Sequence, residues 1–234
     1  MKTHSGIQLL FRLSFCLAVS LSMALPASAL SQAPGMTFKD SLDRTVTIPA
    51  KVERILSLQP EITRIIIALG AGDRLVGLDY FLRHDDHLFR IIFPQESRLP
   101  VVSKPDDSVN KELVVRLDPD VVFASPSEFQ APDSIQRTLG IPVLALSSLG
   151  HFDKLLEEIQ LVGAATGLDA RAQELVAYFQ EKIRPVFEHT ASVPPPKRPR
   201  VYLAFWSSLT RTPVFYEPVN IAGGVNLAAN LLPS

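Results

Sequence analysis

Short apolar runs alternate with longer amphipathic segments between residues 54 and 146, and this rhythm constrains the fold more than any other feature. The apolar runs predict strands at 54–58, 75–78, 100–103, 120–124 and 141–146. Segments with a 3.6-residue apolar period predict helices at 60–69, 110–117 and 133–139, each followed by glycine or proline. Strands that are apolar on both faces and alternate with helices predict an α/β fold with a parallel sheet and right-handed crossovers.

The remaining segments predict a hairpin, a helical region and the start of a second unit. Alternating residues at 37–40 and 45–48 favour the hairpin, and periodic apolar residues favour helices at 152–166 and 170–188, the second disturbed near Pro185. The proline-rich basic segment 192–200 is typical of a stiff linker. A strand at 200–205 and a helical turn at 219–222 follow. One strand and one turn cannot bury a core, so either a partner completes this unit or the sequence is a fragment.

The N-terminus has the pattern of a cleavable signal peptide. Lys2 and Arg12 are the only strong charges in the first 29 residues, apolar residues dominate from Leu9 to Leu25, and the small residues Ala27-Ser28-Ala29 follow. This arrangement predicts export and cleavage near Ala29. A membrane anchor normally needs about 20 apolar residues and has no such cleavage pattern.

Removing residues 1–29 changes the composition of the chain. The single cysteine, Cys16, leaves with them, which excludes disulfides, thiol catalysis and cysteine-based zinc sites in the exported part. The segment also takes two of the 23 basic residues and none of the 24 acidic ones, so the remaining net charge is -3. This charge gives no support to nucleic-acid binding or to adhesion on anionic membranes.

Polar or turn-forming loops follow four of the predicted strands. In parallel sheets, ligands bind beyond the carboxyl ends of the strands. The loops are 57–60, 79–81, 103–105 and 125–127, and their candidate ligand contacts are Gln59, Tyr80, Phe81, Lys104 and Ser125. The same residue types also occur in ordinary loops for conformational reasons, so topology alone leaves both interpretations open.

Six ordered segments resemble the substrate-binding proteins of ABC importers for metal chelates. They are Asp43-Arg44-x-Val-x-Ile-Pro49; Arg54-Ile-Leu-Ser-Leu58 with Pro60, Thr63 and Ala68-Leu-Gly70; Arg74-Leu-Val-Gly77; Asn110-Lys-Glu112 with Leu117-x-Pro119-Asp120-Val-Val122; Gly140-Ile-Pro142-Val143; and Gly223-Gly224-x-Asn226-Leu-Ala228. The resemblance implies two Rossmann-like lobes with parallel sheets, joined by a long helix, with the second lobe incomplete in this chain. It places a signal peptide at 1–29, the first lobe at 30–150, a helical linker at 151–198 and the start of the second lobe at 199–234.

The same resemblance implies a function in capture and delivery. The expected ligand is a metal chelate, such as a ferric siderophore, haem or a corrinoid, and the expected partner is the permease of an ABC transporter. The family binds without catalysis, so we expect a periplasmic or otherwise extracytoplasmic monomer, with no cofactor, no nucleic acid and no metal bound directly by side chains. A truncated receptor without function is the alternative that the short second lobe leaves open.

The resemblance also assigns roles to individual residues. Glu112 falls where the family docks its first lobe onto an arginine of the permease, although an acid there also simply favours the start of a helix. From the second lobe, Trp206 and Tyr216 could stack on a planar ligand, and Arg211 suits an anionic chelate. Tyr216 could equally belong to the core. In B12 binders of the family, aromatic residues occupy the positions that Asp106 and Ser125 hold in this sequence.

Two other patterns suggest different chemistry. His84-Asp-Asp-His87 would place two imidazoles on one face of a helix, a spacing compatible with metal binding but without a third ligand. Ser108-Val-Asn-Lys111 matches the S-x-x-K of penicillin-interacting serine enzymes but lacks their other motifs. A secreted serine hydrolase using Ser108 and Lys111 is therefore the alternative enzyme hypothesis. The basic run 197–200 is typical of a solvated linker.

Overall fold

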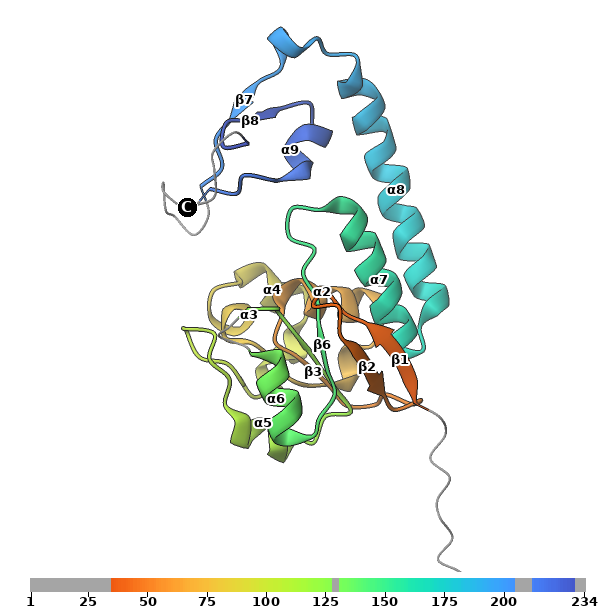
Figure 1. Ribbon diagram of the computed structural model, residues 1–234, viewed down its shortest axis with the longest axis vertical. Coiled ribbons are helices and arrows are strands. Elements are labelled where there is room, and N and C mark those ends of the chain that lie inside the picture. Colours follow the sequence, from red (N-terminus) through yellow and green to blue (C-terminus); the bar gives the residue numbers. More distant parts are fainter. Residues whose placement is uncertain (1–34, 128–130, 205–211, 230–234) are drawn as a thin grey trace, which may run out of the picture. The chain divides into compact units, whose positions relative to one another are not determined.

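A parallel β-sheet forms the centre of the first lobe (Figure 1). The computed structural model describes residues 35–127, 131–204 and 212–229. The strands are β1 (Met36–Lys39), β2 (Thr45–Ile48), β3 (Ile55–Ser57), β4 (Leu75–Gly77), β5 (Val121–Ala124), β6 (Val143–Ala145), β7 (Arg200–Val201) and β8 (Val225–Asn226). The four-stranded sheet has the order β4-β3-β5-β6, and all its neighbours pair in parallel. The predicted α/β class and parallel sheet are confirmed.

Helices cover both faces of this sheet. They are α2 (Pro60–Leu69), α3 (Tyr80–His84), α4 (His87–Ile92), α5 (Lys111–Leu117), α6 (Pro132–Leu139), α7 (Phe152–Thr166), α8 (Asp169–Ala191) and α9 (Glu217–Ile221), with 3-10 turns η1 (Gly72–Arg74), η2 (Pro94–Arg98) and η3 (Pro195–Lys197). Ile55 and Phe123 point into a core shared with α2, α7 and the start of α8. Their neighbours Leu56 and Val122 point into the other core, against α5 and α6. The alternation follows from the two-residue period of a strand.

A buried carboxylate, together with Ser41, joins the hairpin β1–β2 to the sheet; the Ser41 N–H and hydroxyl both donate to the Ala145 carbonyl, at 2.9 and 2.8 Å. Asp40 is 6% exposed and accepts hydrogen bonds from the backbone of Leu42, Arg44 and Ala145, at 3.0, 3.0 and 3.1 Å. The Arg44 guanidinium donates to the same carboxylate at 2.9 and 2.5 Å, and to the Val143 carbonyl at 2.9 Å. Burial alone would raise the pKa of Asp40, but the hydrogen bonds from Arg44 and the backbone outweigh it and lower the pKa.

The helices α7 and α8 form an antiparallel pair beside the first lobe. Gly163 of α7 lets the helices approach closely, since a Cβ there would lie 2.3 Å from the Ala172 Cβ of α8. Only Ala172 and Val176 of α8 are buried, so its first half anchors the helix and the rest is largely exposed. With 23 residues, α8 is about 35 Å long. It runs through Pro185 to Ala191, so the predicted disturbance does not end the helix.

The described part of the second unit is small. The strands β7 and β8 form a two-residue parallel pair, and α9 lies between them in sequence. Gly223 follows α9 with a φ of 78°, the left-handed conformation expected from the Gly-Gly pair. Val225 and Leu227 stay exposed, at 40% and 39%. The strand predicted at 200–205 is described only as far as residue 204, and it forms just two ladder positions.

The sequence prediction was wrong in two places. The segment 100–103 forms only isolated bridges, Leu78 with Val101 and Ser103 with Val109, because it leaves the sheet edge after one contact. The segment 80–98 contains α3, α4 and η2, none of which was predicted. The helix α4 exposes apolar residues instead of burying them on one stripe, which obscured its period.

We predict that Asp40→Ala lowers the free energy of unfolding by about 3 kcal/mol, because three backbone donors lose their acceptor and Arg44 loses its buried carboxylate, keeping only the Val143 carbonyl and the exposed Asp133. Chemical denaturation measures this change. Lys39→Ala is the matched control, since it removes an ion pair whose side chains are 70% and 86% exposed, and it should change stability by less than about 0.5 kcal/mol. Equal effects of the two substitutions would show that the Asp40 network does not hold the hairpin.

Candidate functional site

The carboxyl ends of β3 and β5 mark a switch point in the sheet. The chain leaves β3 toward β4 on one side, and leaves β5 toward β6 on the other, although β3 and β5 are neighbours. Ligands of open α/β sheets bind in the crevice that such a divergence creates. Gln59 and Ser125 follow these two strands, so the structure brings two predicted contact residues to the switch point.

The loop after β3 is held in place by a small buried network. The Thr63 hydroxyl donates to the Ser57 hydroxyl at 2.7 Å, and the Ser57 hydroxyl bonds the Gln59 carbonyl at 3.2 Å. Ser57 and Thr63 are fully buried. The Gln59 side chain donates to the Leu146 carbonyl at 3.4 Å, in the loop after β6. The start of α2 is therefore fixed to the ends of β3 and β6 before any ligand arrives.

The loop after β4 is built around Asp79. One carboxylate oxygen, Oδ1, accepts from the Leu82 backbone at 3.0 Å and so caps α3, while Oδ2 has no hydrogen-bond partner. The neighbouring Tyr80 N–H donates to the Ser103 hydroxyl at 2.8 Å. This arrangement fixes the backbone from which the Tyr80 and Phe81 side chains project.

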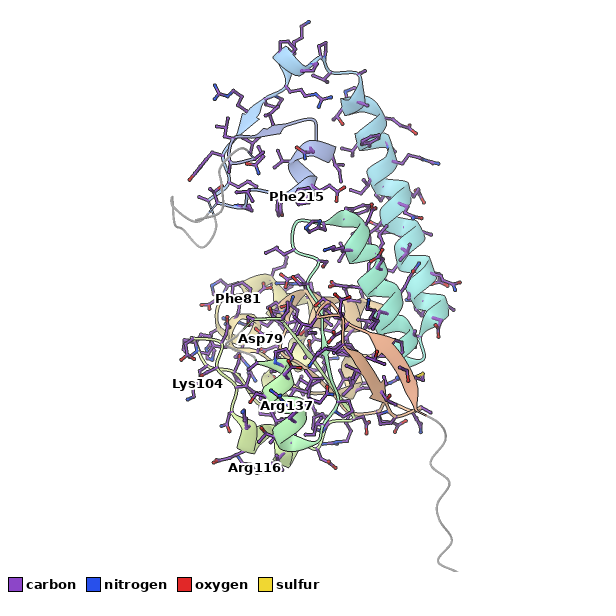
Figure 2. The ribbon with its side chains drawn as sticks, in the orientation of Figure 1. Asp79, Phe81, Lys104, Arg116, Arg137 and Phe215 are labelled. Carbon is purple, nitrogen blue, oxygen red and sulfur yellow. The ribbon has the colours of Figure 1, made fainter. Side chains whose placement is uncertain are left out.

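The predicted contacts Tyr80, Phe81 and Lys104 lie on the first lobe, as Gln59 and Ser125 do. The Tyr80 ring stacks on His84, with centroids 4.3 Å apart, and Phe81 is 43% exposed. Figure 2 shows Phe81 near one end of the first lobe and Arg116, in the last turn of α5, near the other. Lys104 is exposed and lies in the turn that follows Ser103.

The predicted contacts from the second unit fall into two groups. Trp206 and Arg211 lie outside the described residues. Tyr216 is half-buried at the start of α9 and lines a cavity of about 330 Å³ with apolar residues such as Val201 and Val219. This setting matches the alternative that Tyr216 belongs to a core, and the role of Tyr216 in ligand binding stays a prediction.

A contact that was not predicted joins residues 150–152 to residues 215–217. The Glu217 carboxylate accepts from the Phe152 backbone at 2.7 Å, and the Glu217 N–H donates to the Gly150 carbonyl at 2.8 Å. The His151 and Phe215 rings stack, with centroids 4.3 Å apart. Since His151 provides no side-chain cap for α7, Glu217 supplies it from a distant part of the sequence.

Buried acids give this edge of the sheet an unusual electrostatic character. Burial raises the pKa of Asp79 to about 7. The hydrogen bond from the Leu82 backbone opposes this rise, and the nearby Glu61 carboxylate adds to it. Burial also raises the pKa of Glu158. The hydrogen bond from Ser148 lowers this pKa, and the Glu61 carboxylate raises it further. Both buried acids keep one oxygen without a partner. Sequence reasoning missed both, although an aspartate before a short apolar segment is a helix-capping signal.

The two alternative chemistries are not supported by geometry. His84 is the last residue of α3 and His87 the first of α4, so the two imidazoles do not lie on one helix as the metal hypothesis required. Among the described residues, no group of three or more His, Cys, Asp or Glu side chains is arranged to hold a metal ion. Ser108 donates to Asp106 at 2.7 Å, while the Lys111 amine donates to Ser134 at 2.9 Å, so each has another partner.

Glu112 lies in the first turn of α5 and is exposed. The helix is capped by Asn110, whose side chain accepts from the Leu113 backbone at 3.1 Å. The capping function therefore belongs to Asn110, and the Glu112 carboxylate remains available for a contact outside the chain. Within the described ranges, no helix combines the length and hydropathy that crossing a membrane requires.

Comparisons with known proteins agree with this architecture. The sequence profile of a family described as periplasmic binding protein matches residues 55–232. An uncharacterized ABC transporter substrate-binding lipoprotein of Bacillus subtilis is 29% identical over 171 residues, which cover 72% of this chain and 51% of the relative. A cobalamin-binding protein of Halobacterium salinarum is 26% identical over 230 residues, which cover 92% and 60%.

A solved structure gives the same fold. The molybdate periplasmic binding protein of Haemophilus influenzae superposes with a TM-score of 0.71 at 24% identity, over 84% of this chain and 67% of the other. The chain thus spans about half to three fifths of the length of the curated relatives named above.

We predict that Asp79→Asn removes much of the pH dependence of stability between about pH 4 and pH 7. The pKa rises on folding from 3.8 to about 7, so the folded state binds more protons in this window and the free energy of unfolding falls as the pH rises. Asparagine keeps the capping oxygen and cannot ionise. At pH 7.5 the variant should be more stable than the wild type by roughly 1–3 kcal/mol, as measured by urea denaturation across the pH range.

Asp86→Asn is the control, because Asp86 caps α4 in the same way but is paired with Arg64. Burial tends to raise the pKa of Asp86, but the hydrogen bond from Arg64 and the other contacts lower it overall. This substitution should reduce stability at neutral pH. An unchanged pH profile in Asp79→Asn would mean that Asp79 titrates normally in the folded protein.

Proposed function

Because this chain belongs to the periplasmic binding protein family, we propose that it acts as an extracytoplasmic solute-binding protein of an ABC importer. Its ligand is a metal chelate, such as a ferric siderophore, haem or a corrinoid, which it delivers to a membrane permease. The observation that carries the proposal is the position of Gln59 and Ser125 at the switch point of the sheet, beside the aromatic residues of α3.

The chemistry of this edge suits a chelate better than a bare ion. A chelate already satisfies the coordination of its metal, so the protein needs surfaces for the organic shell rather than metal ligands. Tyr80 and Phe81 offer aromatic surface on a backbone fixed by Asp79 and Ser103. Gln59 offers an amide, and Lys104 an exposed cation. Pockets of this kind combine apolar surface with a few fixed polar groups.

The hydrogen-bond partners of Ser108 and Lys111 argue against the hydrolase alternative. A serine nucleophile needs a base within hydrogen-bond reach. In the described structure, Ser108 bonds the carboxylate of Asp106 and Lys111 bonds Ser134. We therefore propose that the protein is a receptor and not a hydrolase.

The first of three predictions from this proposed function concerns the ligand. Purified chain is titrated with ferric desferrioxamine, haem and cyanocobalamin by isothermal calorimetry, and we expect one of the three classes to bind. Phe81→Ala should weaken that binding about 3–10-fold, because it removes an exposed ring beside the switch point. Phe187→Ala removes a ring on α8 that is 58% exposed and should leave the affinity unchanged. If none of the three chelates binds, the proposed function fails.

The second prediction concerns the permease. Glu112→Ala should leave chelate affinity unchanged and weaken binding to the permease reconstituted in nanodiscs by about 3-fold or more, as expected for a charge pair across an interface. Glu174→Ala on α8 is the control, since Glu174 is also exposed and pairs with the neighbouring Arg171. Equal permease affinity of wild type and Glu112→Ala would remove the docking role of Glu112.

The third prediction separates a receptor from an enzyme. An acylating probe such as a fluorescent β-lactam should leave the protein unlabelled, because Lys111, the base that the hydrolase hypothesis requires, bonds Ser134 and not Ser108. Intact-mass spectrometry detects any adduct. Labelling that Ser108→Ala abolishes would favour the hydrolase instead.

A further inference from the structure

The second half of α8 has little support from the first lobe. Ala172 and Val176 are the buried residues of the helix, and partly buried Phe179 also packs against the core. Phe187, further along the helix, is 58% exposed. Pro185 lies in the same exposed half and removes one hydrogen bond of the helical ladder, because proline has no N–H. The helix alone is therefore a weak restraint on the position of the second unit.

The segment around α9 is held at two places. The Thr190 hydroxyl of α8 donates to the Ile221 carbonyl at 2.7 Å, and a Cβ on Gly223 would lie 2.8 Å from the Thr190 Cβ. At the other end of α9, the Glu217 carboxylate accepts from the Phe152 N–H of α7 at 2.7 Å. The first anchor moves with α8. The second anchor ties α9 to α7, which packs on the sheet of the first lobe.

Directed contacts, rather than close packing, make up the second anchor. Besides its carboxylate, Glu217 uses its N–H, which donates to the Gly150 carbonyl at 2.8 Å. Gly150 has a φ of 82°, and a Cβ there would lie 3.1 Å from the Phe215 carbonyl oxygen. A cavity of about 330 Å³ borders Phe215 and Glu217, and Phe215 is 47% exposed although its ring stacks on His151. Since the cavity leaves this anchor loosely packed, its hydrogen bonds and the ring stack hold it. We call the contacts of Phe215 and Glu217 with residues 150–152 the latch.

The loop 146–151 connects the latch to the candidate ligand site. The Leu146 carbonyl, just after β6, accepts from the Gln59 side chain at 3.4 Å. The His151 N–H donates at 2.8 Å to the carbonyl of Ser148, a residue that is 7% exposed. One hydrogen-bonded loop therefore runs from a predicted ligand contact to the start of α7. This connection places the latch beside the carboxyl edge of the sheet.

We propose that the latch holds the second unit in the position in which both lobes contact the ligand, with Glu217 as the positioning residue. A carboxylate at the first N–H groups of a 15-residue helix is favoured by the helix dipole as well as by its hydrogen bond. The helix α8 sets the spacing of the two units, and the latch restrains their angle. When the competent arrangement is only partly populated, the apparent affinity falls by that fraction, so release of the latch weakens binding. This last step rests on the proposed function, whereas the latch itself does not.

The first test needs no ligand. Since the exported part of the chain has no cysteine, Arg116→Cys/Val225→Cys allows one spin label on each lobe, at exposed positions. We expect double electron–electron resonance to give one narrow distance distribution, which Glu217→Ala broadens at least about two-fold. Glu217→Gln keeps an acceptor oxygen and should broaden the distribution less. Glu157→Ala, which removes an exposed acid of α7, is the matched control and should leave the distribution unchanged.

The second test measures chelate affinity by calorimetry, with ferric desferrioxamine, haem and cyanocobalamin as probes. Glu217→Ala should weaken binding of the chelate that binds wild type about 3–10-fold, because it lowers the population of the competent arrangement. Phe215→Ala removes the ring that stacks on His151 and should act in the same direction on both readouts. Because Phe215 is 47% exposed, this variant keeps the fold even where Glu217→Ala does not.

An unchanged distance distribution in both variants would overturn the proposal. A broader distribution with unchanged chelate affinity would also overturn it, because the latch would then not position the ligand. If no chelate binds wild type, the proposed function fails, and the distance distribution alone decides whether the latch holds the second unit.

Discussion

The parallel pairing of β3 with β5 determines most of the architecture. Three successive residues of β3 pair with three of β5, from Ile55 with Val121 to Ser57 with Phe123, and the Leu58 N–H extends the ladder to the Phe123 carbonyl at 2.8 Å. Asp120 fixes the entrance, since its carboxylate accepts from the Glu53 and Arg54 backbone at 2.7 and 2.8 Å. This pairing separates the two cores and creates the switch point at which the candidate ligand site lies.

Two aspartates with the same local task show how environment sets their chemistry. Asp79 and Asp86 each cap a short helix by accepting a backbone hydrogen bond three residues ahead. Asp86 is paired with Arg64, which holds its pKa below the ordinary value despite burial. Asp79 has no cation and keeps one oxygen unpartnered, so burial raises its pKa to about 7. Only Asp79 therefore carries an energetic cost when ionised.

The sequence predicted the elements whose local and tertiary signals agree. Helix 60–69 begins at Pro60 and ends before Gly70, and α7 ends before Gly167, as their proline and glycine signals indicated. The hairpin and the parallel sheet were predicted because their apolar periods match their burial. The helices α3 and α4 were not predicted, because exposed apolar residues on α4 conflict with a simple amphipathic pattern.

The candidate site was predicted only in part for a similar reason. Topology brings Gln59 and Ser125 to one edge, and that could be inferred from strand order in a parallel sheet. The buried states of Asp79 and Glu158, and the cap that Glu217 provides for α7, depend on contacts between residues far apart in the sequence. No local pattern encodes such contacts, and Trp206 and Arg211 lie outside the described residues.

The proposed binding site for a chelate is the carboxyl edge of the sheet, at the switch point between β3 and β5. Hydrogen exchange followed by mass spectrometry, with and without the chelate that binds in calorimetry, tests it most directly. If a chelate binds there, it should slow exchange in residues 58–63 and 80–84, and leave exchange unchanged in the last turns of α5 and α6, near Arg116 and Arg137. Protection confined to those last turns, or no protection at 58–63 and 80–84, would contradict the proposed site.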